Sequence, residues 1–468
     1  MTFRWLGVTR LGVKKGVQQN GLKRGLLTPK CNAKNKDKHQ RGSEMEKLRV
    51  NGQRLWDSLM EMGEIGGTEK GGCNRLAATD LDKQARDLFC DWCKATGCDI
   101  AIDKFGNIFA KRPGLNNDLP AVATGSHLDT QPTGGKFDGV FGVLSGVEVL
   151  RTLHENNITT PTPIEVSVWT NEEGSRFQPA MQGSGVYVGR FDLQKELDKT
   201  DVNGLRLGDE LARIGYLGEE ELGSRNIGAF FEAHIEQGPI LEDEEKAIGV
   251  VRLGQGIRWY NVEVQGRESH SGTTPMHLRK DAMVAAGKIV TEIEALANRY
   301  ENGLGTVGFM QVYPNSRNTI PGNIKFSADL RNPNPEVLAT MHEEFVAFCE
   351  GVAKDRDLDI SVDNFWYFAP VEFNASDDVK AATEKLGYSH MDIYAGAGHD
   401  ACYMADLVPS GMIFTPCENG ISHNEIEYSS PEQCEAGANV LLHTMLTASH
   451  RIAEAAGAPT EESEEEIA

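Results

Sequence analysis

Several polar residues that can bind metal ions follow apolar segments of the chain. The segment GSHLDTQPTGGKFDG, residues 125–139, contains His127, Asp129 and Asp138 after a run of small apolar residues. A glycine-rich loop of this kind can cradle a phosphate, form a plain turn or supply half of a metal site. It lacks the Lys-Ser/Thr ending of a phosphate loop, which leaves the turn and the metal site as alternatives.

Further residues of the same chemical types occur later in the chain. Glu172 and Glu173 end a second apolar segment, His234 lies in FEAHIEQGPILE, and His423 lies in GISHNEIEYSS. Two imidazoles suffice for one catalytic zinc ion, whereas three imidazoles with several carboxylates can hold two divalent ions about 3.5–4 Å apart, bridged by one carboxylate. Each residue alone also fits a solvated loop. The pattern therefore favours a metal hydrolase and leaves the number of ions open.

Two spacings in this set indicate a division of roles. Glu172 and Glu173 are adjacent, so one can ligate a metal while the other remains free to transfer protons. Asp129 lies two residues after His127, a position from which it can orient that imidazole by a hydrogen bond from behind.

The elements that must position these residues alternate between helix and strand. The segment 81–96 has the apolar spacing of an amphipathic helix, 120–127 reads as a buried strand, and 163–174 as another strand ending in acids. Between them, apolar residues from Val140 to Leu150 recur at helical spacing, which predicts a helix from about Gly139. This order is typical of an α/β sheet covered on both faces, in which ligands collect at the carboxyl ends of strands.

The pattern changes over residues 252–365. Alternating strands and two helices, one of them from about Pro275 to Tyr300, predict a compact α+β unit inserted into the larger domain. From about residue 370 the α/β character resumes and ends in a long helix over residues 431–457. We therefore predict a catalytic domain in two parts, 45–251 and 366–457, interrupted by an inserted domain, 252–365.

The composition limits the partners of the protein. The 468 residues carry a formal charge of −22, which argues against nucleic acids and anionic membranes because both require basic surface. We find no apolar run of the roughly 20 residues that a membrane helix needs. The nine cysteines are scattered, so we expect a reducing compartment and no disulfide framework. Cys90, Cys93 and Cys98 lie in a helical pattern without a second cysteine pair, and we expect them to be ordinary thiols.

The two ends of the chain differ from the rest. The first 43 residues contain eleven Lys or Arg and one acid, so the basic tail 1–44 is either a transit peptide or a disordered segment. The corresponding locations are mitochondrial and cytoplasmic. Residues 458–468 are expected to form an acidic, solvated tail.

Seven segments together resemble a known family. GSHLDTQPTGGKFDGVFGVLSGVEVLR, WTNEEGSRF, HIEQGPILEDE, SHSGTTPMHLRKDA, NTIPGNIKFSADLR, GAGHDA and GISHNEIEYSSPE are similar, in this order, to motifs of the amidase–hydantoinase–carbamoylase family of dinuclear metallohydrolases. The resemblance spans roughly residues 50–455 and is strongest to N-carbamoyl-amino-acid hydrolases, including β-ureidopropionase. It implies a zinc-exopeptidase-like catalytic domain and a ferredoxin-like inserted domain that acts as lid and dimerisation domain.

The resemblance also implies a role for each residue of the site. Asp138 would bridge two divalent ions per subunit, zinc or alternatively manganese, nickel or cobalt. Glu172 would be the general base, Asp129 the partner of His127, and His270 would reach the site of a neighbouring subunit to stabilise the oxyanion. The remaining ligands are His127 and His234 on one ion and Glu173 and His423 on the other, and the substrate-binding residues are Arg331, Asn318, Gln237, Gly398 and His399.

The implied activity is hydrolysis of an N-carbamoyl amino acid to the amino acid, ammonia and carbon dioxide. The expected partners are a small ureido substrate with a carboxylate and a second copy of the chain. The nearest alternative is an allantoate amidohydrolase. An aminoacylase or dipeptidase is disfavoured, because related peptidases tend to carry a carboxylate where this chain has His234. A binding protein without catalysis would lack a ligand or the base, and neither is missing.

Overall fold

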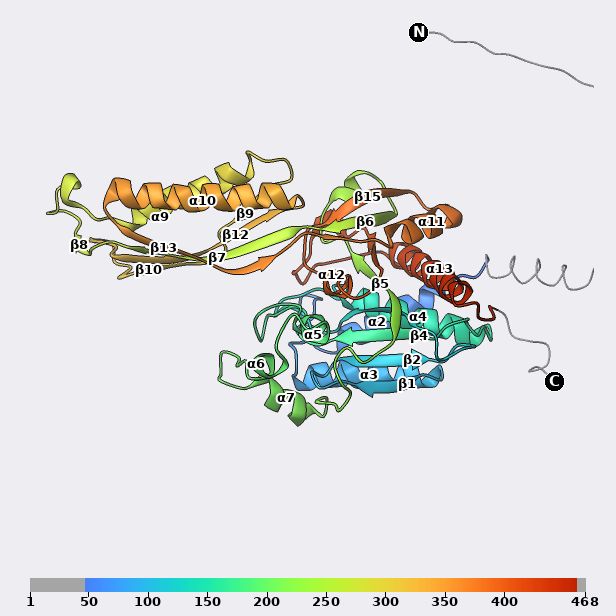
Figure 1. The fold of residues 1–468 in the computed structure, drawn as a ribbon. Coiled ribbons are helices and arrows are strands. Elements are labelled where there is room, and N and C mark those ends of the chain that lie inside the picture. Colours follow the sequence, from blue (N-terminus) through green and yellow to red (C-terminus); the bar gives the residue numbers. More distant parts are fainter. Residues whose placement is uncertain (1–46, 461–468) are drawn as a thin grey trace, which may run out of the picture. The chain divides into compact units, whose positions relative to one another are not determined.

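The strands next to the predicted metal-binding residues belong to one mixed sheet of nine strands (Figure 1). The computed structural model describes residues 47–460. The strand order of the sheet is β1-β2-β4-β3-β5-β16-β6-β14, with β15 paired to β6, and the central strands β4, β3, β5 and β16 run parallel. The strands are β1 (Asp99–Ile102), β2 (Ile108–Arg112), β3 (Ala121–His127), β4 (Ile164–Trp169), β5 (Ile227–Ile235), β6 (Ile248–Gly254), β14 (Val371–Glu372), β15 (His390–Ala395) and β16 (Ser410–Thr415).

Helix α4 (Val140–Glu155) packs against the central strands β3, β4 and β5. Two glycines one helical turn apart allow this close approach. A Cβ at Gly142 would lie 2.3 Å from the carbonyl oxygen of Ala233, and a Cβ at Gly146 would lie 2.8 Å from Val166. Helices α2 (Gly52–Glu64) and α13 (Pro431–Ala455) pack on α4 and on each other, so the beginning and the end of the described chain meet in one helical layer.

Two short helices also pack against this sheet. Helices α5 (Gln182–Tyr187) and α12 (Asp400–Met404) contact each other, and α12 also contacts β5 and β16. The predicted α/β fold with a mixed, helix-covered sheet is thus confirmed. The other helical elements are α3 (Asp80–Ala95), α6 (Leu193–Leu197), α7 (Leu207–Ile214), α8 (Ile240–Asp243), α11 (Ser376–Leu386) and the 3-10 turns Met276–Leu278 and Glu418–Gly420.

A second, antiparallel sheet is formed by the chain between β6 and β14. Its order is β10-β12-β7-β13, with β9 also paired to β12. Helices α9 (Ala282–Ala297) and α10 (Pro335–Arg356) cover one face and enclose a separate apolar core. A short two-stranded sheet adds β8 (Ser269–His270) to β11 (Thr319–Ile320). The five strands are β7 (Gly256–Gln265), β9 (Leu304–Thr306), β10 (Met310–Tyr313), β12 (Asn323–Asn332) and β13 (Asp359–Phe368).

One predicted boundary is wrong. The helix expected from about Pro275 begins at Ala282 and ends at Ala297, because the Asp281 side chain caps it by accepting hydrogen bonds from the N–H groups of Met283 and Val284. The predicted tails, 1–44 and most of 458–468, lie outside the described residues. Within residues 47–460, no helix is both long and apolar enough to cross a membrane.

Candidate functional site

The carboxyl ends of the parallel strands bring the predicted metal-binding residues together. His127 is the last residue of β3, His234 lies near the end of β5, and the loop containing His423 follows β16. Glu172 and Glu173 follow β4. Neighbouring parallel strands end at the same edge of a sheet, so residues separated by up to about three hundred positions in sequence become neighbours in space.

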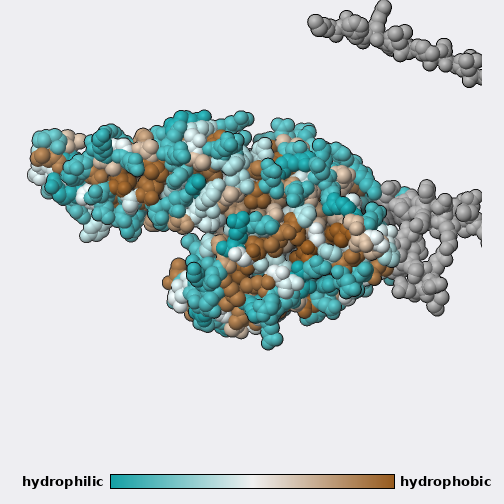
Figure 2. All heavy atoms as spheres, in the orientation of Figure 1, coloured by the Kyte–Doolittle hydropathy of each residue, from teal (hydrophilic) through white to brown (hydrophobic). Residues whose placement is uncertain are grey.

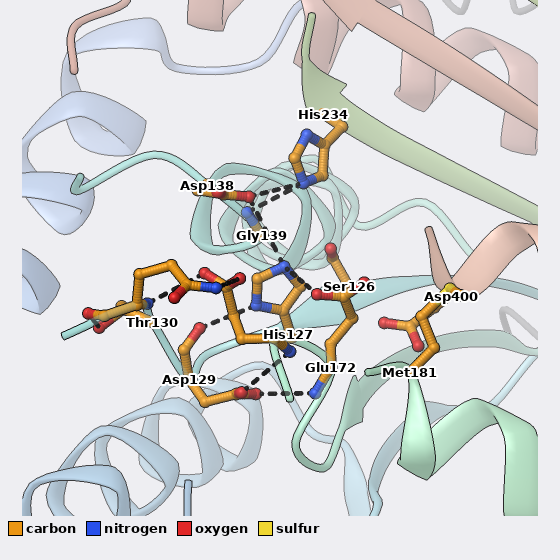
Figure 3. Close-up of polar contacts among 12 residues, drawn as sticks. Ser126, His127, Asp129, Thr130, Asp138, Gly139, Glu172, Met181, His234 and Asp400 are labelled. Carbon is orange, nitrogen blue, oxygen red and sulfur yellow. Dashed lines mark hydrogen bonds and ion pairs between the residues drawn. The ribbon is translucent and has the colours of Figure 1, made fainter. Parts of the chain in front are cut away.

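Asp138 lies at the centre of this group, just before the first turn of α4 (Figure 3). Its Oδ1 lies 3.2 Å from Nε2 of His234 and 3.7 Å from Nε2 of His127, and its Oδ2 lies 3.3 Å from Nε2 of His423. Each carboxylate oxygen therefore faces a different set of imidazoles. Gly139 is required here, because it has a φ of +68° and a Cβ would lie 2.3 Å from Nε2 of His127.

Two clusters of donor atoms share Asp138, and a further group consists of Glu232, His234 and His399. In each cluster the potential ligand atoms lie within 4.8 Å of one another; the first consists of His127, Asp138 and His234, and the second of Asp138, Glu173 and His423. In the second, Nε2 of His423 lies 3.4 Å from Oε2 of Glu173. These are the two ligand sets implied by the family resemblance.

The tautomers of two imidazoles suit metal binding. Nδ1 of His127 lies 2.8 Å from the backbone oxygen of Asp129, and Nδ1 of His234 lies 2.9 Å from the backbone oxygen of Ile235. A carbonyl oxygen only accepts, so each Nδ1 carries a proton and Nε2 is the ring nitrogen that faces the site. Such backing of a ligand imidazole by a hydrogen bond is the usual arrangement in metal centres.

Asp129 contacts His127 through its backbone. Its backbone oxygen, not its carboxylate, contacts the ring of His127. The carboxylate instead accepts hydrogen bonds of 3.2 Å from the backbone N–H groups of both Glu172 and Glu173. Gln131 holds the side chain of Glu173 through its own N–H and its amide nitrogen. Asp129 thus ties the end of β3 to the turn after β4.

Buried acids crowd the site. Burial, and then the charge of Asp138, raise the pKa of Glu173 to about 8. Burial, followed by the charges of Asp400 and Glu173, raises the pKa of Glu172 well above its ordinary value. Carboxylates packed together in a low dielectric destabilise one another's ionised forms, and a divalent cation relieves that repulsion. The charge distribution and the imidazole tautomers both fit a site for divalent metal ions.

Glu172 lies beside the two donor clusters that share Asp138 and belongs to neither of them. Its Oε2 is 3.4 Å from Nε2 of His127, and Figure 3 shows it between His127 and the side chains of Asp400 and Met181. The carboxylate is therefore free of the ligand set but adjacent to it, as a proton-transferring group requires.

The predicted substrate residues divide into two groups, and the first lies at the site. The amide nitrogen of Gln237 donates to Oδ2 of Asp138 at 2.9 Å. The buried ring of His399 packs against that of His234 with centroids 4.5 Å apart. Gly398 leaves room for Met181, whose Cε lies 2.8 Å from where a Cβ would be. Among the described residues, Oε1 of Gln237 and Nε2 of His399 are buried polar atoms without hydrogen-bond partners.

Arg331, on β12, reaches the same loop from the second sheet. Its Nη1 donates to the backbone oxygen of Gly396 at 2.9 Å, and its Nε and Nη2 pair with Asp329. Trp259 also donates to Asp329, so the guanidinium is held in one orientation. Asp329 is a supporting residue that the sequence analysis did not identify.

The second group contains Asn318, which lies away from the site of the same chain together with His270, the residue predicted to stabilise the oxyanion. Both are exposed and share the β8–β11 pair, where the Ser271 N–H donates to the backbone oxygen of Asn318. Strand β7 begins beside Gly396, through contacts of Gln255, and its ten residues run toward this pair. At about 3.3 Å per residue, the far end of β7 is about 30 Å away. Figure 1 shows β8 at the far end of the second sheet.

The buried acids near the site that were not predicted include Glu427 and Glu232 besides Asp400. Glu427 accepts hydrogen bonds from the backbone N–H groups of Phe137 and Asp138. Glu232 accepts hydrogen bonds from the Ser126 hydroxyl and the Ala401 N–H. In the sequence both are single acids without a spacing that distinguishes them from solvated residues. Only their burial reveals them.

Comparison with known proteins places this site in a family. The model of peptidase family M20/M25/M40 matches residues 123–447, which include all the cluster residues. The chain belongs to this family. An N-carbamoyl-L-amino-acid amidohydrolase of Rhizobium meliloti is 48% identical over 404 residues, covering 86% of this chain and 97% of that protein.

Two further relatives define the branch of the M20/M25/M40 family more closely. A solved structure of an amidase of the hydantoinase/carbamoylase family from Burkholderia multivorans has a TM-score of 0.80 and 51% identity, covering 86% of this chain and 98% of that one. An allantoate amidohydrolase of Bacillus subtilis is 32% identical, covering 85% of this chain and 98% of that protein. The resemblance inferred from the seven motifs is confirmed, and the allantoate enzyme is the more distant relative.

Proposed function

We propose that this protein is a metal-dependent hydrolase that cleaves the ureido C–N bond of N-carbamoyl-L-amino acids, giving the amino acid, ammonia and carbon dioxide. The observation that carries the proposal is the pair of donor clusters joined at Asp138, with the separate acid Glu172 beside them. Relatives named for this activity support the choice of substrate.

The two clusters would hold divalent ions, with His127, His234, Glu173 and His423 as ligands and Asp138 shared by both clusters. When bound, such ions lower the pKa of water and polarise a carbonyl group. Glu172 removes a proton from the attacking water and returns it to the leaving nitrogen. Its buried position favours this role, because burial brings the pKa of a carboxyl group nearer to neutrality, where proton transfer in both directions is efficient.

The carboxylate of the substrate is assigned to Arg331. A guanidinium has five N–H donors, of which Asp329 takes two and Gly396 one. One of the two that remain lies on each terminal nitrogen, and a carboxylate offers two oxygens to accept them. Asp329 thereby aims this pair, and Arg331 positions the ureido carbon over the clusters.

Replacing Arg331 with lysine is expected to raise KM for an N-carbamoyl amino acid about 10- to 100-fold, with a smaller change in kcat. The reason is the loss of a bidentate hydrogen bond to a charged group, worth about 1.5–3 kcal/mol. Steady-state kinetics measure both constants. Arg258→Lys, on the neighbouring strand and paired with Asn364, is the matched control. Equal hydrolysis by the parent of an amide analogue without the carboxylate would contradict the assignment.

Gln237 supplies the preference for a ureido group over an acyl group. Its amide nitrogen faces Asp138, so its Oε1 is a fixed acceptor, buried and without a partner among the described residues. A terminal NH₂ of a ureido group can donate to it, whereas the methyl group of an N-acetyl amino acid cannot. A site with an acceptor left unpaired discriminates strongly against the ligand that lacks the donor.

An ammonia-release assay with the parent protein tests the proposed function. We expect hydrolysis of N-carbamoyl-L-amino acids to exceed that of N-acetyl-L-amino acids and dipeptides by at least about 100-fold in kcat/KM, the scale of one unpaired buried polar group, and to be faster than that of allantoate, which also carries the ureido donor. Product amine is measured in parallel for substrates that release no ammonia. Faster hydrolysis of allantoate would instead identify the alternative activity, and faster hydrolysis of N-acetyl substrates would contradict the assignment of Gln237.

We also propose that the second sheet mediates a homodimer in which each subunit donates His270 to the other's site. Within one chain His270 lies about 30 Å along β7 from Gly396, too far to reach its own clusters. The same region exposes large apolar side chains, visible as brown surface over the second sheet (Figure 2), which a second copy would cover. The exposed large apolar side chains along the far part of this sheet include Met276, Leu278, Phe309 and Tyr313.

A further inference from the structure

We infer that Glu427 is a positioning residue that fixes the shared ligand Asp138 relative to His423, and so sets the affinity of the site for metal. The inference rests on the proposed function only in taking Asp138 and His423 as metal ligands. Glu427 is not a member of either donor cluster.

The contacts of Glu427 join two loops that are far apart in sequence. Its Oε1 accepts hydrogen bonds from the N–H groups of Phe137, at 3.0 Å, and Asp138, at 3.1 Å. Its Oε2 accepts the hydroxyl hydrogen of Ser422 at 2.7 Å, next to His423. One carboxylate thus holds the backbone of the bridging ligand and the residue beside the terminal ligand of the second cluster.

The side chain of Glu427 is buried, and the neighbouring loop leaves room for it. Its exposed fraction is 5%. The adjacent Tyr428 and the hydrogen-bonded residue Phe137 pack with Trp56, and the ring centroids of the three lie 5.8–6.0 Å apart. A Cβ at Gly135 would lie 2.0 Å from Oε1 of Glu427 and 2.5 Å from its Cβ. Glycine at position 135 therefore lets the carboxylate approach the backbone of the Asp138 loop.

The geometry requires an acceptor at Glu427 and does not require its charge. In Glu427→Gln the amide oxygen can still accept both backbone N–H groups, and the amide nitrogen can donate to the hydroxyl oxygen of Ser422. In Glu427→Ala the two N–H groups lose their acceptor, and the Asp138 loop is no longer tied to the His423 loop. Loss of a residue that orients metal ligands typically lowers metal affinity about 10- to 100-fold.

The test measures Zn²⁺ affinity of the full-length protein by competition with a chromophoric chelator. We expect Glu427→Ala to bind Zn²⁺ about 10- to 100-fold more weakly than the parent and Glu427→Gln to remain within about threefold. Glu425→Gln, which removes an acid of the same loop that pairs with Lys70, is the matched control and is expected to match the parent. Melting temperatures of the metal-free proteins show that each variant is folded.

Gly135→Ala is a second, independent variant for the case in which Glu427→Ala does not fold. Its added methyl group displaces Glu427 and is expected to weaken Zn²⁺ binding to a similar extent, and the losses of the two variants should not add in the double variant, because both act on one contact. Parental affinity in Glu427→Ala, or equal weakening in Glu427→Gln, would overturn the inference. These affinities do not depend on which substrate is hydrolysed, so failure of the ureido assay with weak binding by Glu427→Ala would overturn only the proposed function.

Discussion

Glu172→Gln is expected to lower kcat for an N-carbamoyl-L-amino acid by about 10²- to 10⁴-fold, the range for loss of a general acid–base group. Glutamine has nearly the same shape, so the turn held by Asp129 should remain intact. Because Glu172 belongs to neither donor cluster, the content of bound metal should stay at the parental value. Steady-state kinetics and elemental analysis of the same preparation measure the two quantities.

The neighbouring acid provides the matched control. Glu173 lies 3.4 Å from Nε2 of His423 within the second cluster, so Glu173→Gln should lose metal and activity together. The two variants differ by one position in sequence and make the same chemical change. If Glu172→Gln retains kcat within about threefold of the parent, or loses metal as Glu173→Gln does, Glu172 is not the base.

The sequence was sufficient to predict the central part of the site because its residues follow apolar strands. His127 ends β3, and the Glu172–Glu173 pair follows β4, so the rule that parallel strands share a carboxyl edge brings them together without a structure. The predicted helix after Gly139 begins at Val140. The family motifs then favoured a metal-binding role for these side chains over that of ordinary loop residues.

Contacts made by backbone atoms or by single buried acids could not be predicted. A spacing of two residues places Asp129 near His127, but which atoms of Asp129 make the contact depends on the path of the loop, and its carboxylate turns toward Glu172 and Glu173. Glu427 sits in a polar segment that reads as a solvated turn, and its contacts are with the distant loop around Gly135 and Asp138, which the local sequence does not reveal. The late start of α9 depends on the capping side chain of Asp281, which the apolar periodicity does not contain.

The predicted site residues lie at opposite ends of the second sheet, with Arg331 beside Gly396 and His270 at the far end. His270→Ala should lower kcat by about 10²- to 10³-fold, as expected for loss of a group that stabilises an oxyanion. If His270 acts in the neighbouring subunit's site, a heterodimer of one His270→Ala subunit and one Glu172→Gln subunit contains one site with both residues and one with neither. Such a heterodimer should therefore regain about half of the parental activity.

Two affinity tags on co-expressed chains allow the heterodimer to be purified free of both homodimers. Each homodimer lacks one of the two residues in both of its sites and serves as the inactive control, and sedimentation establishes that every preparation is dimeric. If His270 instead acted within its own chain, each site of the heterodimer would lack one residue, and activity would stay at the level of the homodimers. That result would contradict the shared site, because β7 extends about 30 Å and only a large rearrangement of the second sheet could then bring His270 to its own clusters.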